Sequence, residues 1–229
     1  MRASHIDPAA DSVPRRTNPQ PCPDLVWYAA YGSNMSLTRL RTYLRGGRPD
    51  GGALSVPGCR DSTDPIRSVP LLLPGVLYFA TESRIWSGGR AFYDPRCPGA
   101  IAVHAHLLTT AQFSDIAAQE MYRAPGTSLD FTGITGSRPM TLGPGRYETV
   151  ICAGSHDGYP VLTFTAPWRY RDLPGNPPAA AYLRCLAAGL RAAHRWSVSA
   201  VAGYLATRPG ADRRWNPDAV GALLRADGI

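Results

Sequence analysis

Short apolar runs alternate with polar, irregular stretches along the chain, and their periodicity predicts the secondary structure. Residues 25–30, Leu-Val-Trp-Tyr-Ala-Ala, are rich in strand-forming side chains and end at a glycine turn, so they predict a short buried strand. Leu37, Leu40 and Leu44 then recur at helical spacing, and the glycine pair at residues 46–47 ends this helix. Further strands are predicted at residues 75–80, 90–93, 100–108, 146–153 and 159–165, and helices at residues 110–122, 181–194, 198–206 and 218–225.

The order of these elements predicts an α+β protein, with a small mixed β-barrel or curved sheet flanked by helices. Asp157-Gly158, between the last two strands, is typical of a tight hairpin. Residues 46–74 and 124–145 are rich in Gly and Pro and are predicted to be long irregular segments. A loop as long as residues 46–74 usually forms a lid or a binding rim in a compact domain and is otherwise disordered. Residues 1–24 contain five prolines and are expected to be a disordered tail, with a single domain over residues 25–229.

Composition narrows the classes of function. All 24 basic residues are arginines, which excludes mechanisms that need a Schiff-base lysine or a phosphate-loop lysine. The net charge of +7 would suit nucleic acid, but no aromatic residues are interleaved with the arginines as a stacking platform requires, so no nucleic-acid partner is expected. Arg41, Arg45 and Arg48 are instead predicted to form a solvated helix face.

Cellular location follows from what the sequence lacks. No apolar run reaches membrane-spanning length and no signal-peptide pattern is visible, so a cytoplasmic protein without a membrane partner is expected. The five cysteines are scattered and never form a Cys-x-x-Cys pair, which predicts free thiols. The oligomeric state is left open.

The loop Tyr31-Gly32-Ser33-Asn34 follows the first strand and precedes the first helix. A strand that turns straight into a helix gathers unpaired backbone N–H groups at the positive end of the helix dipole, where an anion binds well. Gly32 allows close approach of a ligand to the backbone, and Ser33 and Asn34 add hydrogen-bonding side chains. A simple capping turn explains the same residues, so both interpretations stay open at this point.

The helix predicted from residue 110 carries a carboxylate on its apolar side. It opens with the capping-box pattern at residues 109–112, and its inward face is marked by Phe113, Ile116 and Ala117. Glu120 is the next position on that face, whereas Asp115 and Gln119 are expected to point outward.

A buried carboxylate has either a function or a partner. Burying it unpaired costs several kcal/mol or raises its pKa by as much as about 3–5 units, which favours a catalytic base at Glu120. The alternative is a structural ion pair with Arg90 or Arg123.

His104 and His106 alternate on one predicted strand and therefore share a face. Two histidines without a third ligand nearby do not make a metal site, so a pair of partly exposed strand histidines is expected, with no metal and no cofactor.

Three motifs together resemble the γ-glutamyl cyclotransferase-like proteins. They are residues 31–35, Tyr-Gly-Ser-Asn-Met, after an apolar strand, residues 87–89, Ser-Gly-Gly, before a second strand, and a glutamate at the end of a helix. The resemblance covers roughly residues 26–204, with the motifs in the same order. It implies a small mixed β-barrel with flanking helices, and Glu120 as the catalytic acid/base. The substrate-binding residues that it implies are Tyr31, Gly32, Ser33, Asn34, Met35, Gly88, Gly89 and Tyr147.

The reaction implied by the resemblance is an intramolecular cleavage. The α-amine of a small γ-glutamyl compound attacks its own γ-carbonyl, which releases 5-oxoproline and an amine without a metal or cofactor. Two alternatives remain: a non-catalytic binding module for a small metabolite or a protein, and an amide hydrolase or acyl transferase that uses the same base. The insertions at residues 46–74 and 124–145 border the expected pocket, so they leave the identity of the γ-glutamyl substrate open.

Overall fold

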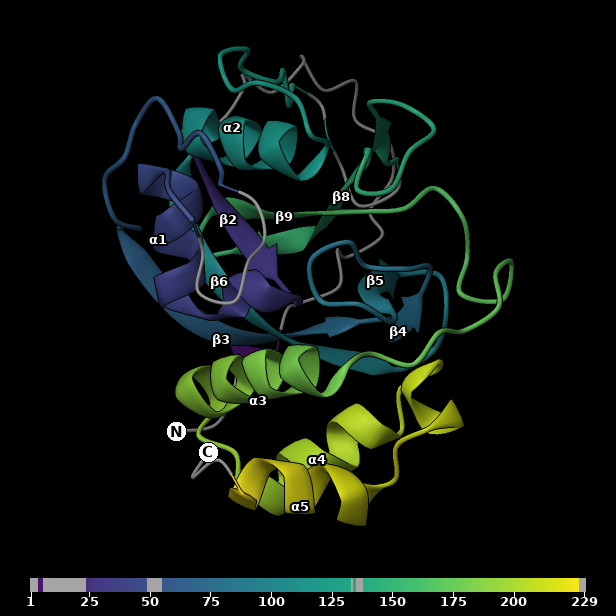
Figure 1. Ribbon diagram of the computed structural model, residues 1–229. Coiled ribbons are helices and arrows are strands. Elements are labelled where there is room, and N and C mark those ends of the chain that lie inside the picture. The colour runs from purple at the N-terminus through teal and green to yellow at the C-terminus, as the bar shows by residue number, and fades with distance from the viewer. Residues whose placement is uncertain (1–3, 6–23, 49–54, 133, 135–137, 227–229) are drawn as a thin grey trace.

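The structure is a computed structural model that describes residues 4–5, 24–48, 55–132, 134 and 138–226. Within these residues the chain is an α+β protein with a strongly curled seven-stranded sheet, a separate two-stranded hairpin and surrounding helices (Figure 1). This confirms the predicted fold class. The sheet contains β1 (Ser4–His5), β2 (Leu25–Ala30), β3 (Arg67–Pro74), β6 (Ala100–Thr109), β7 (Met140–Thr141), β8 (Thr149–His156) and β9 (Tyr159–Thr165), and the hairpin contains β4 (Val76–Ala80) and β5 (Arg90–Asp94). The helices are α1 (Leu37–Arg45), α2 (Thr110–Glu120), α3 (Ala180–His194), α4 (Val198–Ala206) and α5 (Pro217–Ala226), with 3₁₀ turns η1 (Ser33–Met35) and η2 (Ala211–Arg213).

Strand β2 lies at the centre of the sheet, whose order is β1-β3-β6-β2-β9-β8-β7. It pairs antiparallel with β6 and parallel with β9, so the sheet is mixed. Five of its six residues are buried, as expected for a strand covered on both faces. Its C-terminal end therefore lies inside the protein, and the loop at residues 31–34 begins there.

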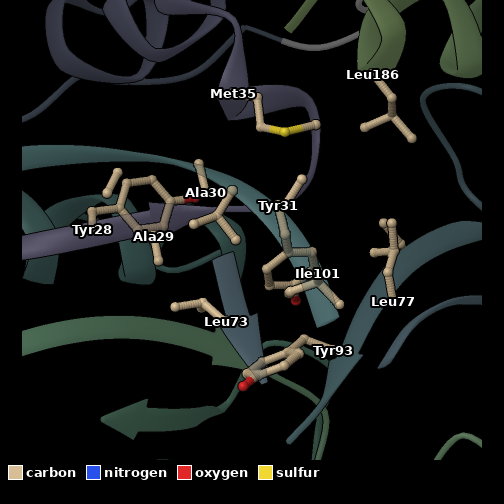
Figure 2. Packing of buried hydrophobic residues seen from close by; sticks show 14 of the residues in the cluster. Tyr28, Ala29, Ala30, Tyr31, Met35, Leu73, Leu77, Tyr93, Ile101 and Leu186 are labelled. Carbon is tan, nitrogen blue, oxygen red and sulfur yellow. The ribbon is translucent and has the colours of Figure 1, made fainter. Parts of the chain in front are cut away.

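Helices cover the curled sheet on two sides. Figure 1 shows α2 on one side and α3 on the other, with α4 and α5 beyond α3. The apolar interior between them includes Tyr31, Met35, Tyr93 and Leu186, which Figure 2 labels among the side chains of one buried cluster. The hairpin β4–β5 is joined to the sheet by Thr165, whose hydroxyl accepts from the Tyr93 N–H at 3.0 Å and donates to the Tyr93 carbonyl at 2.7 Å.

Local signals in the sequence are confirmed at several element ends. The capping box is present, since the Thr109 side chain accepts from the Gln112 N–H while the Gln112 side chain accepts from the Thr109 N–H. Asp157 and Gly158 have φ values of 48° and 82°, which a tight hairpin turn requires. The amide of Gly46, which follows α1, donates to the Thr42 carbonyl.

The prediction of one continuous loop over residues 46–74 is wrong at its end, where β3 pairs with β6 along its whole length. Pro70 obscures the strand pattern because proline lacks a backbone donor. It is tolerated because β3 has only the two-residue β1 on its other side. Leu71 and Leu73 are fully buried and alternate as strand residues should.

Of the predicted tail, only Ser4, His5 and Asp24 are described, and Ser4–His5 pair in parallel with Leu71 and Leu72. The rest of residues 1–24 lies outside the described residues, and the disordered tail and single domain remain predictions. The second predicted loop, residues 124–145, contains the short strand β7. None of the described helices has the length and apolarity needed to cross a membrane.

Candidate active site

The candidate site begins where β2 ends. Residues 33–35 form the 3₁₀ turn η1, in which the Met35 N–H donates to the Gly32 carbonyl at 3.1 Å and the Ser36 N–H donates to the Ser33 carbonyl at 3.1 Å. The strand was expected to run straight into the helix, but the 3₁₀ turn η1 separates β2 from α1. Ser36 is the N-cap residue of α1, but its side chain forms no capping bond.

Two histidines of β6 contact the backbone of this loop. His106 is fully buried, with Nε2 3.2 Å from the Asn34 carbonyl oxygen and Nδ1 2.8 Å from the Ser68 hydroxyl. His104 lies beside it, with Nδ1 2.8 Å from the Met35 carbonyl oxygen. The expectation of partly exposed histidines is wrong for His106, because the loop folds back over this face of β6 and covers it.

The protonation of His106 follows from its partners. A carbonyl oxygen can only accept, so Nε2 carries the hydrogen and Nδ1 accepts from Ser68. Burial, together with the neighbouring His104, lowers the pKa of His106 to about 3. His106 is therefore a neutral support for the loop at physiological pH.

Asn34 connects the loop to the end of α2. Its Nδ2 donates to the Tyr28 hydroxyl at 3.2 Å and to Glu120 Oε1 at 3.3 Å. Since an ionised carboxylate only accepts, the Glu120 contact fixes which end of the Asn34 amide faces α2. The Asn34 side-chain oxygen is buried and has no hydrogen-bond partner. An unsatisfied buried acceptor of this kind is unfavourable unless another molecule supplies a donor.

Glu120 is the last residue of α2, and its carboxylate points inward, in agreement with its place on the apolar stripe. The side chain is half-buried because it borders a cavity. Burial raises the pKa of the Glu120 carboxyl, although a hydrogen bond from Tyr43 and the charge of Arg39 oppose this rise. A carboxyl group whose pKa is raised by burial beside a cavity has the environment in which general bases are found.

Asp115 and Gln119, expected to point outward, are both buried. The reason is that the connection between α1 and β3 packs over the outer side of α2. Asp115 accepts from the Arg60 N–H at 2.9 Å and from Arg60 Nε at 3.0 Å, and Gln119 accepts from the Gly58 N–H at 3.3 Å. Part of the insertion at residues 46–74 is therefore attached to the helix that carries Glu120.

The two arginines considered as ion-pair partners of Glu120 are engaged elsewhere. Arg123 pairs with Glu148 at 2.7 Å, and Arg90 donates to the backbone carbonyl of Glu82. Arg90 is nevertheless near enough that its charge lowers the pKa of Glu120. Its Nε is buried and has no hydrogen-bond partner.

These side chains surround a cavity of about 70 Å³, whose lining includes several aromatic rings. Its charged lining residues are Arg39, Arg90 and Glu120. Trp86 stacks on Tyr182 with ring centroids 5.4 Å apart, and the Arg39 guanidinium carbon lies 4.8 Å from the centre of the Trp86 ring. The full lining consists of Tyr28, Tyr31, Gly32, Ser33, Asn34, Arg39, Tyr43, Ser83, Ile85, Trp86, Arg90, Ala91, Glu120, Tyr122, Tyr147, Phe164 and Tyr182.

The structure brings most of the sequence-predicted site residues to this cavity. Besides Glu120, they are Tyr31, Gly32, Ser33, Asn34 and Tyr147. The Tyr31 hydroxyl donates to the Phe164 carbonyl at 2.8 Å and the Tyr147 hydroxyl donates to the Ala91 carbonyl at 2.8 Å, so both rings are fixed in the wall.

Three sequence-predicted site residues do not line the cavity. Met35 is buried in the core, where it packs against Gly189 of α3. Gly88 and Gly89 lie against the backbone of residues 176–178, so close that a Cβ on either would collide with a carbonyl oxygen. These glycines allow a close approach between two segments of the protein and do not border the cavity.

Sequence reasoning missed several wall residues, Arg39 and Tyr43 of α1 among them. Their spacing of four places both on one side of the helix, and both are buried, which is unusual for an arginine. Arg90 was considered only as an ion-pair partner, although it begins a strand in which all five residues are buried. An arginine within a run of apolar strand residues is the signal that could have indicated a binding role.

Within the described part of the chain, no group of three or more His, Cys, Asp or Glu side chains is placed to hold a metal ion. The four cysteines that the structure describes there are free.

The sequence and the fold were compared with known proteins, and the similarities found are limited. No protein-family model matches the sequence. "Histone deacetylase 5" from Arabidopsis thaliana is 30% identical over 201 residues, which is 79% of this chain but 30% of that protein. The chain thus spans less than a third of this curated relative. A solved γ-glutamyl cyclotransferase aligns with a TM-score of 0.47 and 11% identity, covering 88% of this chain and 99% of that one. An uncharacterized protein from Homo sapiens aligns with a TM-score of 0.41 and 16% identity, covering 74% and 80%. Both TM-scores lie below 0.5, so the fold described above rests on its own strands and helices.

Proposed function

We propose that this chain is a γ-glutamyl cyclotransferase-type enzyme that releases 5-oxoproline and an amine from a small γ-glutamyl amide or peptide. The observation that carries the proposal is the Glu120 carboxylate. It lies at a cavity wall beside the loop at residues 31–34, and burial raises its pKa. A base next to a small polar cavity suits a reaction that needs proton transfer and a folded substrate, with no further reactant.

In the proposed mechanism Glu120 accepts a proton from the α-ammonium group of the substrate. The freed amine attacks the γ-carbonyl carbon, and a carbon–nitrogen bond closes the five-membered ring. The carbonyl oxygen becomes an oxyanion, which the backbone amides of residues 32–34 stabilise. When the tetrahedral intermediate collapses, its bond to the leaving nitrogen breaks, and that nitrogen takes the proton held by Glu120. The Glu120 carboxylate then accepts the second proton of the ring nitrogen, which leaves neutral 5-oxoproline, and passes it to the released amine, which departs as an ammonium.

The reaction is favoured because both reacting groups belong to one molecule. Well-oriented intramolecular reactions reach effective molarities of about 10⁵–10⁸ M, so holding the substrate folded supplies much of the acceleration. The tyrosines that line the cavity keep their protons, since burial raises the pKa values of Tyr28, Tyr31 and Tyr147. Their rings form part of the cavity wall while their hydroxyl groups stay neutral.

The test is product analysis by mass spectrometry over a panel of γ-glutamyl peptides and γ-glutamyl amines. A cyclotransferase yields 5-oxoproline, an amide hydrolase yields glutamate, and a binding module yields no product. Glu120→Gln should reduce kcat by about 10²–10⁴-fold. Glu148→Gln is the matched control, because Glu148 pairs with Arg123 outside the cavity and should tolerate the same change.

The pH dependence separates a catalytic base from a structural ion pair. Because the pKa of Glu120 is raised in the folded protein, kcat should climb as the pH rises through that pKa, and the climb should be absent in Glu120→Gln. The raised pKa also means that the stability contributed by this carboxyl is fully present below its unfolded pKa and is lost as the pH rises through the folded pKa. Glu120→Gln should therefore be at least as stable as the wild type at neutral pH. A folded Glu120→Gln variant with normal turnover would refute the assignment.

A further inference from the structure

A second cavity lies on the opposite face of strand β9 from the cavity beside Glu120, which we call the Glu120 cavity. Successive strand residues point to opposite faces, and Phe164 lines the Glu120 cavity whereas Thr165 lines the second one. None of the described residues lines both. The second cavity has a volume of about 180 Å³, larger than the Glu120 cavity of about 70 Å³. We call it the β8–β9 cavity, because Thr149 and Ile151 of β8 and Thr165 of β9 form one wall.

The lining of the β8–β9 cavity is largely apolar. Ile151 and Ala166 are buried there, and two aromatic residues, Tyr93 and Trp168, also line it. A space of this size is unusual, because protein interiors contain few gaps larger than a water molecule. An apolar cavity of about 150 Å³ in another protein binds benzene, so the β8–β9 cavity has room for one six-membered ring.

Arg96 is the one charged residue among those that line the β8–β9 cavity in the described part of the chain. Its positive charge is already compensated, because Arg96 Nε lies 3.3 Å from Asp94 Oδ1 and the Arg96 backbone N–H donates to the same oxygen at 3.0 Å. A charged ligand would lose its hydration without gaining a free partner of opposite charge. The lining therefore favours a neutral ligand.

One hydroxyl group on this wall lacks a partner. Thr149 is 6% exposed, and its Oγ1 is buried without a hydrogen bond. Thr165 lies opposite Thr149 in the pairing of β8 with β9, but its hydroxyl is occupied by the backbone N–H and carbonyl of Tyr93. The Trp168 indole nitrogen is also without a hydrogen bond, but the Tyr78 hydroxyl lies within its reach. Because an unpaired buried hydroxyl is unfavourable, Thr149 indicates a ligand with a hydrogen-bonding group of its own.

We propose that the β8–β9 cavity binds a small neutral aromatic compound that carries one hydrogen-bonding group, such as a phenol. The ring occupies the apolar space beside Tyr93 and Trp168, since aromatic rings pack favourably against one another edge to face or offset. The polar group pairs with Thr149 Oγ1, which can both donate and accept a hydrogen bond. This site is independent of the reaction proposed at Glu120.

Phenol and toluene are suitable probes, because they have nearly the same shape and differ in a hydroxyl against a methyl group. Each is titrated into the full chain with labelled isoleucine methyl groups, and nuclear magnetic resonance follows the Ile151 signal from the cavity wall. Both probes should shift this signal saturably. In Thr149→Val a methyl group replaces the hydroxyl at nearly constant shape, so the affinity for phenol should fall about three- to tenfold relative to that for toluene.

Three controls accompany this measurement. Thr149→Ser retains the hydroxyl and should keep the wild-type ratio of the two affinities. Ser155→Ala removes an exposed hydroxyl from the same strand and should leave that ratio unchanged. Ile85 lines the Glu120 cavity, so its methyl signal reports the other site in the same spectrum. Thr149→Val should unfold at the wild-type temperature or above it, because the hydroxyl that it removes makes no hydrogen bond in the free protein.

Three results would overturn the inference. The first is an Ile151 signal that moves with neither probe up to the solubility limit of toluene. The second is a Thr149→Val variant with the wild-type ratio of affinities, and the third is a shift confined to Ile85, which would place the probes in the Glu120 cavity. Release of 5-oxoproline is assayed separately, so none of these results bears on the proposed function.

Discussion

Replacing Gly189 by alanine should test how closely α3 supports the loop of the candidate site. Gly189 lies inside α3, and an added Cβ would stand 2.7 Å from the Met35 Cβ and 3.3 Å from the Met35 carbonyl carbon. Carbon atoms pack at about 3.5–4.0 Å, so either α3 or the 3₁₀ turn η1 must move. Overpacking of this kind costs about 1–3 kcal/mol, whereas the better helix propensity of alanine returns about 1 kcal/mol.

Gly203→Ala is the matched control, because Gly203 also lies inside a helix, α4, and an added Cβ would meet nothing within 4 Å. Both variants gain the same propensity, so the difference between them isolates the contact with Met35. That difference should be about 1–3 kcal/mol, or at least about 2 °C in Tm for a chain of this size, with Gly189→Ala lower. Thermal unfolding followed by circular dichroism measures it. Equal Tm values for the two variants would refute the argument that α3 and η1 are tightly packed.

The remaining predictions concern the supports of the site and its loop. Asp115→Ala leaves the Arg60 and Gly126 N–H groups without an acceptor and should cost at least about 2 kcal/mol in urea unfolding, whereas Asp64→Ala, at an exposed ion pair, should change little. Burial keeps the pKa of His106 at about 3, far below the 6.5 of an exposed histidine, so stability should fall as the pH drops from about 6.5 toward 3, and this part of the slope should disappear in His106→Gln. Gly32 has φ −105°, so Gly32→Val causes no left-handed strain; its side chain instead enters the cavity near the Tyr182 hydroxyl, and KM should rise more than Tm falls. An unchanged KM in the folded variant would remove the loop from the site.

The sequence predicted correctly those elements that depend on interactions between residues close together in the chain. The capping box before α2, the hairpin at Asp157-Gly158 and the stripe of Leu37, Leu40 and Leu44 all appear where the sequence places them, because each depends on residues a few positions apart. β3 was missed because its pairing with β6 is a long-range interaction, and its prolines hide the alternation.

The candidate site shows the same division. Glu120 and the loop at residues 31–34 were predicted because a carboxylate on an apolar stripe and a glycine turn after a strand are visible in the sequence. The burial of Asp115 and His106 was not predicted, because it depends on distant segments that fold over α2 and β6. Arg39 and Arg90 likewise face one cavity only because two separate segments meet there.

The stacked Trp86 gives the cavity an optical signal of its own. Of the five tryptophans in the chain, Trp86 is the one that lines the Glu120 cavity, where it stacks on the Tyr182 ring and contacts the Arg39 guanidinium. Indole fluorescence responds to charges close to the ring, so a carboxylate that enters beside Arg39 would shift the emission of Trp86 without any attached dye. Filling of the cavity is therefore observable in the unmodified chain on the timescale of rapid mixing, and a Trp86→Phe variant, which keeps an aromatic ring at that position, identifies the part of the signal that comes from this site.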